Sequence, residues 1–181
     1  MNFKEYITES TIHSKISDYL PIGWWKDEPI YLFHGTRLAT WKEKIEPSGA
    51  LLPNIWTKPT DRTYKKVYVA LDPYTARGYG AMAGEWDYKT KAKAKQKEIL
   101  DRYGEKVILV FKFDNIEEFN KLNFSESSEK WKLLKDRKYY DEWIAKNNEK
   151  IDFKFYEMAE LWSYNKIPLS YLDKIIFTGE M

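Results

Sequence analysis

The chain has 181 residues, of which 43% are hydrophobic and 32% are charged, and its 30 basic residues nearly balance its 28 acidic ones. This length is typical of a single domain, and the small net charge of +2 does not by itself require a nucleic acid or an anionic membrane as a partner. The lack of cysteine excludes disulfides, thiolate zinc sites and a cysteine nucleophile. Because no apolar stretch approaches the roughly 18 to 20 residues that span a bilayer, no membrane partner is expected.

Periodic patterns of apolar residues predict the elements of the N-terminal part of the chain. In the strand predicted from PIYLFHGT, His34 lies close to the end, and Pro47 to Gly49 is a stop signal for the helix that follows. The predicted elements, in chain order, are two short helices over 1–9 and 12–20, a strand over 29–36, a helix over 38–49 and a polar loop over 50–65.

The rest of the chain mixes strands and helices. Asp72 as an N-cap and Pro73 at the first helical position predict the start of a helix. The predicted elements are a strand over 66–72, this helix, a Lys-rich helix to about residue 102, a strand over 106–114, helical structure over 115–150, and then one or two strands, a turn or short helix from Pro168 and a last strand. Because the order shows no regular βαβ alternation, the predicted fold class is α+β.

Lysines alternate with other residues in KTKAKAKQK, residues 89–97. On a helix this spacing spreads the lysines around the cylinder and does not gather them into one stripe. A solvated helix is therefore the favoured interpretation, and a contact with phosphate backbones is the alternative.

His34, in YLFHGTR, is one of only two histidines in the chain. A zinc site is disfavoured because the other histidine, His13, is 21 residues away and any further ligands would have to be carboxylates. The sequence contains no G-x-S-x-G elbow, no P-loop and no dinucleotide fingerprint. Taken alone, His34 is open to two interpretations, a strand-end histidine that bonds to backbone and a functional residue.

Four segments occur in a suggestive order: FHGTR, IEPSGALLP, VYVALDPYTARGYG and AELWSYNKIPLSYLDKIIF. This set, which spans residues 30–177, resembles the ADP-ribosyltransferase superfamily, in particular its His-Tyr-Glu branch, which includes diphtheria-type toxins and poly(ADP-ribose) polymerases. The resemblance implies an ADP-ribosyltransferase-like split β-sandwich with peripheral helices, formed by a single catalytic domain over residues 10–181. A monomer is expected.

The resemblance also implies a role for individual residues. His34, Gly35 and Thr36 would hold NAD, and the rings of Tyr68 and Tyr79 would stack on its nicotinamide. His34, Tyr68 and Glu160 would be the catalytic residues, with the Glu160 carboxylate stabilising an oxocarbenium-like ribose. NAD would be consumed as a substrate, and no metal is expected.

The identity of the glutamate leaves alternatives. Glu160 precedes Ile167-Pro168 by seven and eight residues, which is the usual relation in this superfamily, whereas Glu157 and Glu180 are the other candidates near late strands. The arginine-modifying branch uses an E-x-E pair. Because Glu157 and Glu160 are separated by two residues, that branch is not matched, and arginine as the acceptor is weakly supported.

The first residues, FKEYITE followed by Ser10, resemble the capsid-targeting segments of internal head proteins in T-even-like phages. Ile7-Thr8-Glu9 matches the context in which a prohead protease cleaves, so residues 1–9 would be a propeptide removed after Glu9. The protein would then be located in the capsid interior of the virion and later in the host cytoplasm. An ordinary first helix is the alternative.

The expected function is that of an NAD-dependent mono-ADP-ribosyltransferase, a phage-encoded effector that modifies a host protein or nucleic acid. One alternative is an RNA 2′-phosphotransferase-like enzyme, which also consumes NAD and binds phosphate through arginines. Arg37, Arg62 and Arg77 are the arginines near the motifs. A non-catalytic head or inhibitor protein that keeps the fold is the other alternative.

Overall fold

In the computed structural model of the chain, the structure describes residues 29–55, 59–61, 63–71, 73–82, 86–87, 92–93, 95–126, 137–147 and 160–178. Several predictions lie outside the described residues: the two N-terminal helices, the cleavage position after Glu9, the cap Asp72, and the alternative glutamates Glu157 and Glu180.

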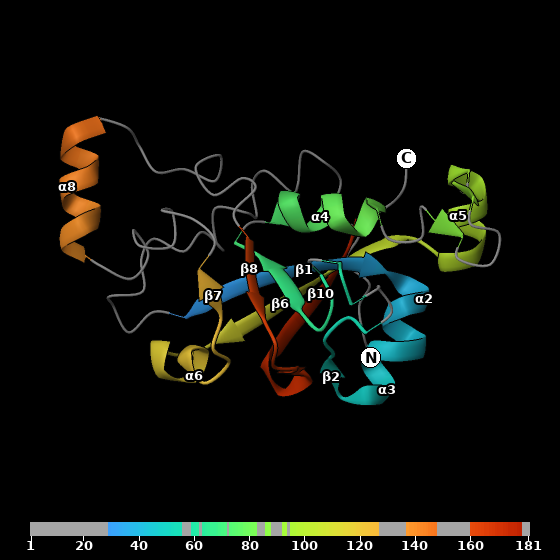
Figure 1. Cartoon of the computed structure of the whole chain (residues 1–181), viewed down its shortest axis with the longest axis horizontal. Coiled ribbons are helices and arrows are strands. Elements are labelled where there is room, and N and C mark those ends of the chain that lie inside the picture. The colour runs from blue at the N-terminus through green and yellow to red at the C-terminus, as the bar shows by residue number, and fades with distance from the viewer. Residues whose placement is uncertain are drawn as a thin grey trace.

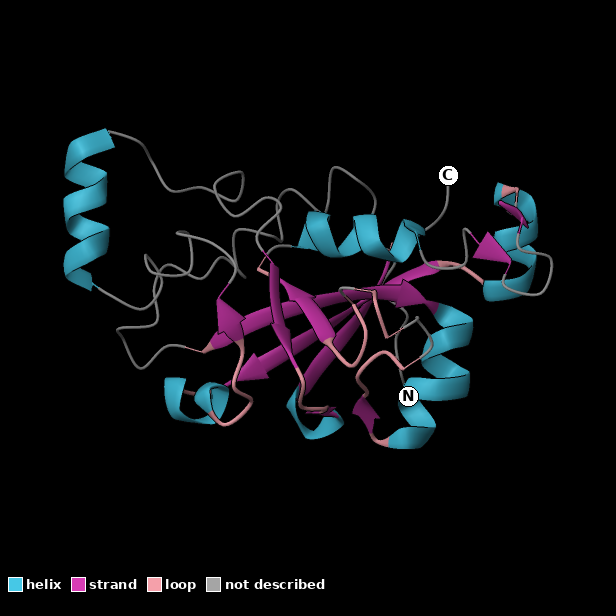
Figure 2. Ribbon diagram, in the orientation of Figure 1, coloured by secondary structure: helices cyan, strands magenta, loops and turns pink. Residues whose placement is uncertain are grey.

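A six-stranded antiparallel sheet forms the centre of the described structure, with helices on both of its sides (Figure 1). The strand order is β10-β6-β1-β3-β8-β7, so β1 and β3 are the central pair. The strands are β1 (Ile30–Arg37), β3 (Val67–Ala70), β6 (Lys106–Phe113), β7 (Ser125–Glu126), β8 (Glu160–Ser163) and β10 (Leu172–Phe177). The mixture of helices with an antiparallel sheet agrees with the α+β class predicted from the sequence (Figure 2).

Apolar residues cover both faces of the sheet. In β6, Val107 and Leu109 belong to a large core cluster on one side, here called the broad face, whereas Ile108 and Val110 belong to a smaller cluster on the other side. Helix α4 (Pro73–Met82) covers the smaller cluster through Ala76, and this side is called the α4 face. A strand that is buried on both faces reads as a continuous apolar run, which is why KVILVFKF predicts β6 clearly.

The helix predicted over 38–49 is confirmed, and its centre has π geometry. The helical turns run without interruption through α2 (Leu38–Thr40), η2 (Trp41–Ile45) and α3 (Glu46–Ser48). Trp41 and Ile45 are buried against the broad face, and Gly49 ends the segment with φ +67°, a conformation that favours glycine. The other helices are α5 (Gln96–Tyr103), α6 (Ile116–Asn120), α8 (Arg137–Asn147) and the short η3 (Leu169–Tyr171).

Three predictions of local structure are wrong. Residues 50–51 are a strand and not part of a loop, because β2 (Ala50–Leu51) pairs with β9 (Ile167–Pro168). The Lys-rich helix begins only at Gln96, since β5 (Ala92–Lys93) pairs with β4 (Trp86–Asp87). The region 115–150 also includes the two-residue strand β7, which lies at the edge of the sheet next to β8. Strands of two residues are too short for periodicity to reveal, and two of these pairings, β2 with β9 and β7 with β8, also join segments that are far apart in the sequence.

The sheet is paired unevenly at its centre. β1 pairs with β6 at eight positions, from Ile30 opposite Phe113 to Arg37 opposite Lys106, whereas β1 pairs with β3 at one position, Phe33 opposite Ala70. The line between β1 and β3 from this pair toward Arg37 of β1 and Val67 of β3 is called the seam. His34 is therefore in the middle of β1 and not at a strand end as predicted, because β6 keeps the strand extended after β3 has separated from it.

Candidate active site at the seam

The His34 side chain crosses the seam. Its Nδ1 lies 2.9 Å from the backbone oxygen of Tyr68, so a side chain of β1 bonds to the backbone of β3. The alternation of β1 assigns His34 to the broad face, along with Ile30 and Leu32. The bond to the Tyr68 carbonyl keeps Nδ1 of this ring at the seam.

This bond fixes the tautomer of the imidazole. A carbonyl oxygen only accepts, so Nδ1 of His34 carries the proton and donates it, and Nε2 keeps its lone pair. Burial lowers the pKa of His34 below its ordinary value of 6.5, and the bond to the Tyr68 carbonyl opposes that shift without cancelling it. The ring is therefore neutral at pH 7, and within the described part of the chain Nε2 is an acceptor without a partner.

Gly35 allows helix α4 to lie directly on β1. A Cβ at this position would be 1.5 Å from the backbone oxygen of Ala76 and 2.8 Å from the nitrogen of Gly80. Gly80 makes the reciprocal approach, since a Cβ there would be 3.1 Å from the oxygen of Thr36. The two glycines therefore set the distance between α4 and the strand that carries His34, with α4 above the sheet in Figure 1.

Register places Glu160 and Tyr68 near one another. Ala70 lies opposite both Phe33 of β1 and Glu160 of β8, so these three residues form one row across the central strands. Residues in one row share a face, and Glu160 is therefore on the α4 face, where its side chain is half-exposed. Tyr68 precedes Ala70 by two residues and lies on the same face, about 6.6 to 6.8 Å along the strand.

The other predicted NAD-binding residues are in different environments. Thr36 is 4% exposed, so its side chain lies in the interior. Tyr79 is on α4 next to Gly80 and is half-exposed. The structure thus bonds the His34 ring to the Tyr68 backbone and places Glu160 diagonally from Tyr68 on the next strand. The Tyr68 and Glu160 side chains lie on the α4 face, opposite to the face that strand alternation assigns to His34.

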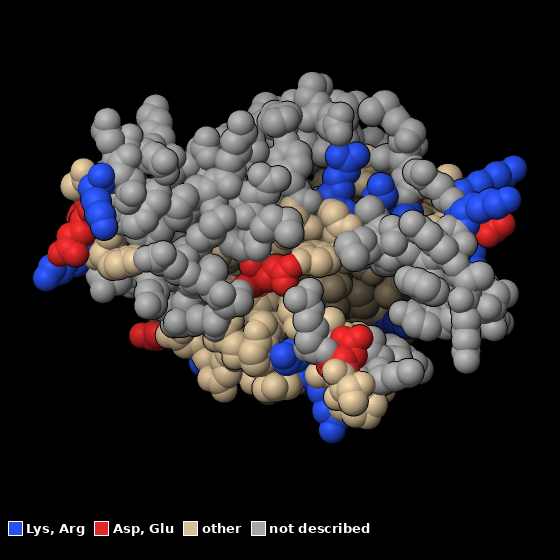
Figure 3. All heavy atoms as spheres, turned by 45° about the horizontal axis from the view of Figure 1, so that its top comes forward, with Lys and Arg blue, Asp and Glu red and all other residues tan. Residues whose placement is uncertain are grey.

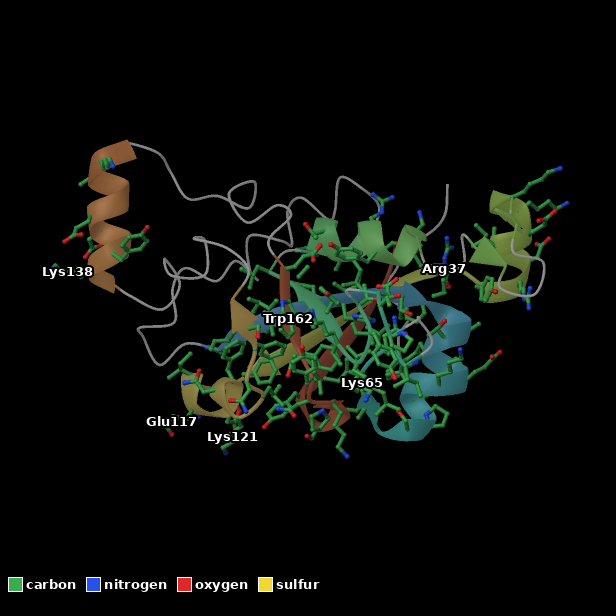
Figure 4. The ribbon with its side chains drawn as sticks, viewed as in Figure 1. Arg37, Lys65, Glu117, Lys121, Lys138 and Trp162 are labelled. Atoms are coloured by element: carbon green, nitrogen blue, oxygen red, sulfur yellow. The ribbon has the colours of Figure 1, made fainter. Side chains whose placement is uncertain are left out.

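Arg37 is buried and tied to backbone. It is 3% exposed, and its Nη1 donates to the backbone oxygen of Gly104 at 3.1 Å. In Figure 4, Arg37 lies toward the α5 end of the sheet, away from Trp162. A guanidinium in this position fastens the end of β1 to the turn before β6 and is poorly placed to bind a substrate phosphate.

Two residues next to the site have no predicted role from the sequence. The Lys66 Nζ lies 4.0 Å from the centroid of the Trp162 ring, and Trp162 packs edge-on against Tyr164 with centroids 5.1 Å apart. Trp162 follows Glu160 by two residues on β8, so strand alternation was the signal that could have placed the indole on the same face as the carboxylate.

The surface on the α4 side is uneven. Figure 3 shows a hollow near the middle of this side, floored by uncharged side chains and with acidic side chains close to it. Among the described residues there is no group of three or more histidine, aspartate or glutamate side chains that could hold a metal ion. In the same part of the chain, no helix is long and apolar enough to cross a membrane.

The chain was compared with protein-family models, with curated proteins and with solved structures, and none of the three comparisons found a match.

Proposed function

We propose that this chain is an NAD-dependent mono-ADP-ribosyltransferase whose site is built around His34, Tyr68 and Glu160. The observation that carries the proposal is the neutral His34 ring in the seam, bonded through Nδ1 to the Tyr68 carbonyl and presenting Nε2 as an acceptor. An acceptor nitrogen suits a ribose hydroxyl, which has a proton to donate. The sequence resemblance to the His-Tyr-Glu branch supports the same assignment.

The reaction would break the bond between ribose C1′ and the nicotinamide nitrogen. The bonding electrons leave with nicotinamide, which becomes neutral, and C1′ gains oxocarbenium character. The Glu160 carboxylate would accept a hydrogen bond from the ribose 2′-hydroxyl and place negative charge near C1′. An acceptor nucleophile then bonds to C1′ and loses its proton, which completes the transfer.

The remaining groups would bind and orient NAD. Helix α4 covers Gly35 and leaves no room there for the nicotinamide amide, whereas the half-exposed Tyr79 and Tyr68 offer rings for stacking. Positioning of this kind lowers the barrier because the reacting groups no longer have to be brought together from solution.

The buried Arg37 argues against the RNA 2′-phosphotransferase alternative, since its guanidinium is bonded to the Gly104 carbonyl. The proposed biological setting follows from the N-terminal resemblance: a phage effector that is packaged in the capsid interior, enters the host cytoplasm with the DNA and modifies a host macromolecule. A few copies of an enzyme suffice for that task, because each copy turns over many times.

The test is incubation of the purified chain with adenylate-labelled NAD and a host lysate. Label is expected on a macromolecule, with release of free nicotinamide in at least an equal amount. A Glu160→Gln variant is the matched control and should leave the macromolecules unlabelled. If the native chain neither transfers label nor hydrolyses NAD, the proposal is wrong, and His34 is a structural tie across the seam.

A further inference from the structure

A strip of aromatic and basic side chains runs along β3 and β8 on the α4 face. Tyr68 lies opposite Trp162 in the register of these strands, and Lys66 extends over the Trp162 ring. Tyr164 continues the line beyond Trp162. These four residues, Lys66, Tyr68, Trp162 and Tyr164, are called the aromatic strip.

The strip is accessible and leads to Glu160. Tyr164 is 63% exposed, which is unusual for a large ring, and Trp162 is half-exposed. Glu160 precedes Trp162 by two residues on the same face, so the carboxylate is about 6.6 to 6.8 Å from the indole position along β8. A ligand that lies along the strip would therefore end at the proposed catalytic carboxylate.

Backbone hydrogen bonds fix the segment that carries two lysines beside the strip, Lys65 and Lys66. Asn54 donates its N–H to the Lys66 oxygen at 3.0 Å, and Lys65 donates its own to the Asn54 oxygen at 2.7 Å. Lys65 has φ 56°, a left-handed conformation that is rare for lysine and is kept by these bonds. Lys65 and Lys166 are exposed, and both lie at the end of the β3–β8 pairing where Val67 is opposite Ser163 and where Tyr164 follows β8.

We infer that the aromatic strip binds single-stranded nucleic acid and, given the proposed transferase function, presents it as the acceptor of ADP-ribose. Unpaired bases stack on aromatic rings whatever their sequence, and nearby lysines neutralise the phosphates between them. A duplex hides its base faces and cannot use the rings in this way. The acceptor atom would be a hydroxyl oxygen or a base nitrogen that bonds to C1′ and loses its proton as nicotinamide leaves.

Binding is measured first without NAD, by fluorescence anisotropy with a short labelled oligoribonucleotide, the matching oligodeoxyribonucleotide and a duplex of the same sequence. We expect both single strands, or one of them, to bind more tightly than the duplex, with affinity falling as salt rises. Tyr164→Ala should weaken this binding about tenfold, which corresponds to about 1.4 kcal/mol. Tyr103→Ala is the matched control, because Tyr103 is half-exposed beneath Arg102 on α5, and it should bind like the native chain.

Charge is tested with a second pair of variants. Lys65→Glu should weaken binding and make it less sensitive to salt, whereas Lys97→Glu, at an exposed position of α5, should have little effect. Preference for the duplex, an equal loss in Tyr164→Ala and Tyr103→Ala, or no binding at low salt would each overturn the inference.

Transfer is measured second, with labelled NAD and the same oligonucleotides, and hydrolysis of NAD in buffer reports on the catalytic site alone. Tyr164→Ala should hydrolyse NAD at the native rate and modify the oligonucleotide more slowly. If the native chain does not hydrolyse NAD, the proposed transferase function is contradicted, whereas the inference that the strip binds single strands still stands. Oligonucleotides that bind but stay unmodified, while a host protein is labelled, would overturn the assignment of the acceptor.

Discussion

Glu160 carries a single negative charge that glutamine would remove with almost no change of shape. We predict that Glu160→Gln lowers ADP-ribose transfer by about two orders of magnitude or more, because in the proposed reaction this carboxylate would stabilise charge that develops in the transition state. The unfolding midpoint in urea should stay close to native, since the side chain is half-exposed at the start of β8. Transfer is measured as the initial rate of label incorporation from NAD.

Glu157→Gln is the control for this prediction, because Glu157 is one of the two other glutamates considered from the sequence. It should transfer at a near-native rate. Normal turnover in Glu160→Gln together with loss in Glu157→Gln would assign the catalytic role to Glu157 instead.

His34 should make folding stability depend on pH. Its pKa is lowered in the folded state. At pH values between the ordinary 6.5 and the lower folded pKa, the unfolded chain therefore binds a proton at His34 that the folded chain does not. The neutral ring therefore contributes stability in full above pH 6.5, and this contribution is lost as the pH falls through that window. Urea denaturation of the native chain should show the decline.

His34→Gln, which cannot titrate, should flatten this part of the stability profile, whereas His13→Gln should keep it, since these are the only two histidines of the chain. An unchanged slope in His34→Gln would mean that the imidazole is not buried as a neutral ring. The same variant should also lose NAD turnover, because it lacks the fixed Nε2 acceptor.

At the scale of elements, the contact between α4 and β1 depends on Gly35. We predict that Gly35→Ala lowers the free energy of unfolding by at least about 3 kcal/mol or prevents folding, because its methyl group would be 1.5 Å from the backbone oxygen of Ala76. Gly78→Ala, on the same helix, is the matched control. Among the residues that the structure describes, nothing lies within 4 Å of a Cβ there, so alanine should raise helix stability by up to about 1 kcal/mol.

Both variants are compared by chemical denaturation at one pH. A Gly35→Ala protein with native stability would mean that α4 does not rest on β1. A destabilised Gly78→Ala protein would mean that something covers this part of the helix.

The sequence predicts elements well where local pattern and burial agree. β6 follows from KVILVFKF, the helix after β1 from the spacing of Trp41 and Ile45, and α4 from its proline start. The two-residue strands are missed because they are too short to show a period, and for Leu51 opposite Ile167 the partner is also distant in the sequence. The same holds for the proposed site. The order of the motifs predicts His34, Tyr68 and Glu160 as site residues, but no local pattern shows that Lys66 lies over the ring of Trp162 on the neighbouring strand.

At the scale of the whole molecule, the N-terminal resemblance predicts two forms of the chain. Protein made before capsid maturation should begin at Met1, and protein from mature particles should begin at Ser10, since cleavage is expected after Glu9. Intact-mass spectrometry of both samples measures the difference. Glu9→Ala should block processing, whereas Glu5→Ala should permit it, and an intact Met1 in native mature particles would contradict the prediction.

The seam also determines how the sheet can move. Eight paired positions lock β1 to β6 and four lock β3 to β8, whereas a single pair joins β1 to β3. We expect the two halves of such a sheet to rotate slightly relative to one another about the seam, with the hydrogen bond of His34 as a link between them. A substrate bound in the seam would restrict this rotation. Amide hydrogen exchange should therefore slow in β1 and β3, which face the seam, and change little in the other strands.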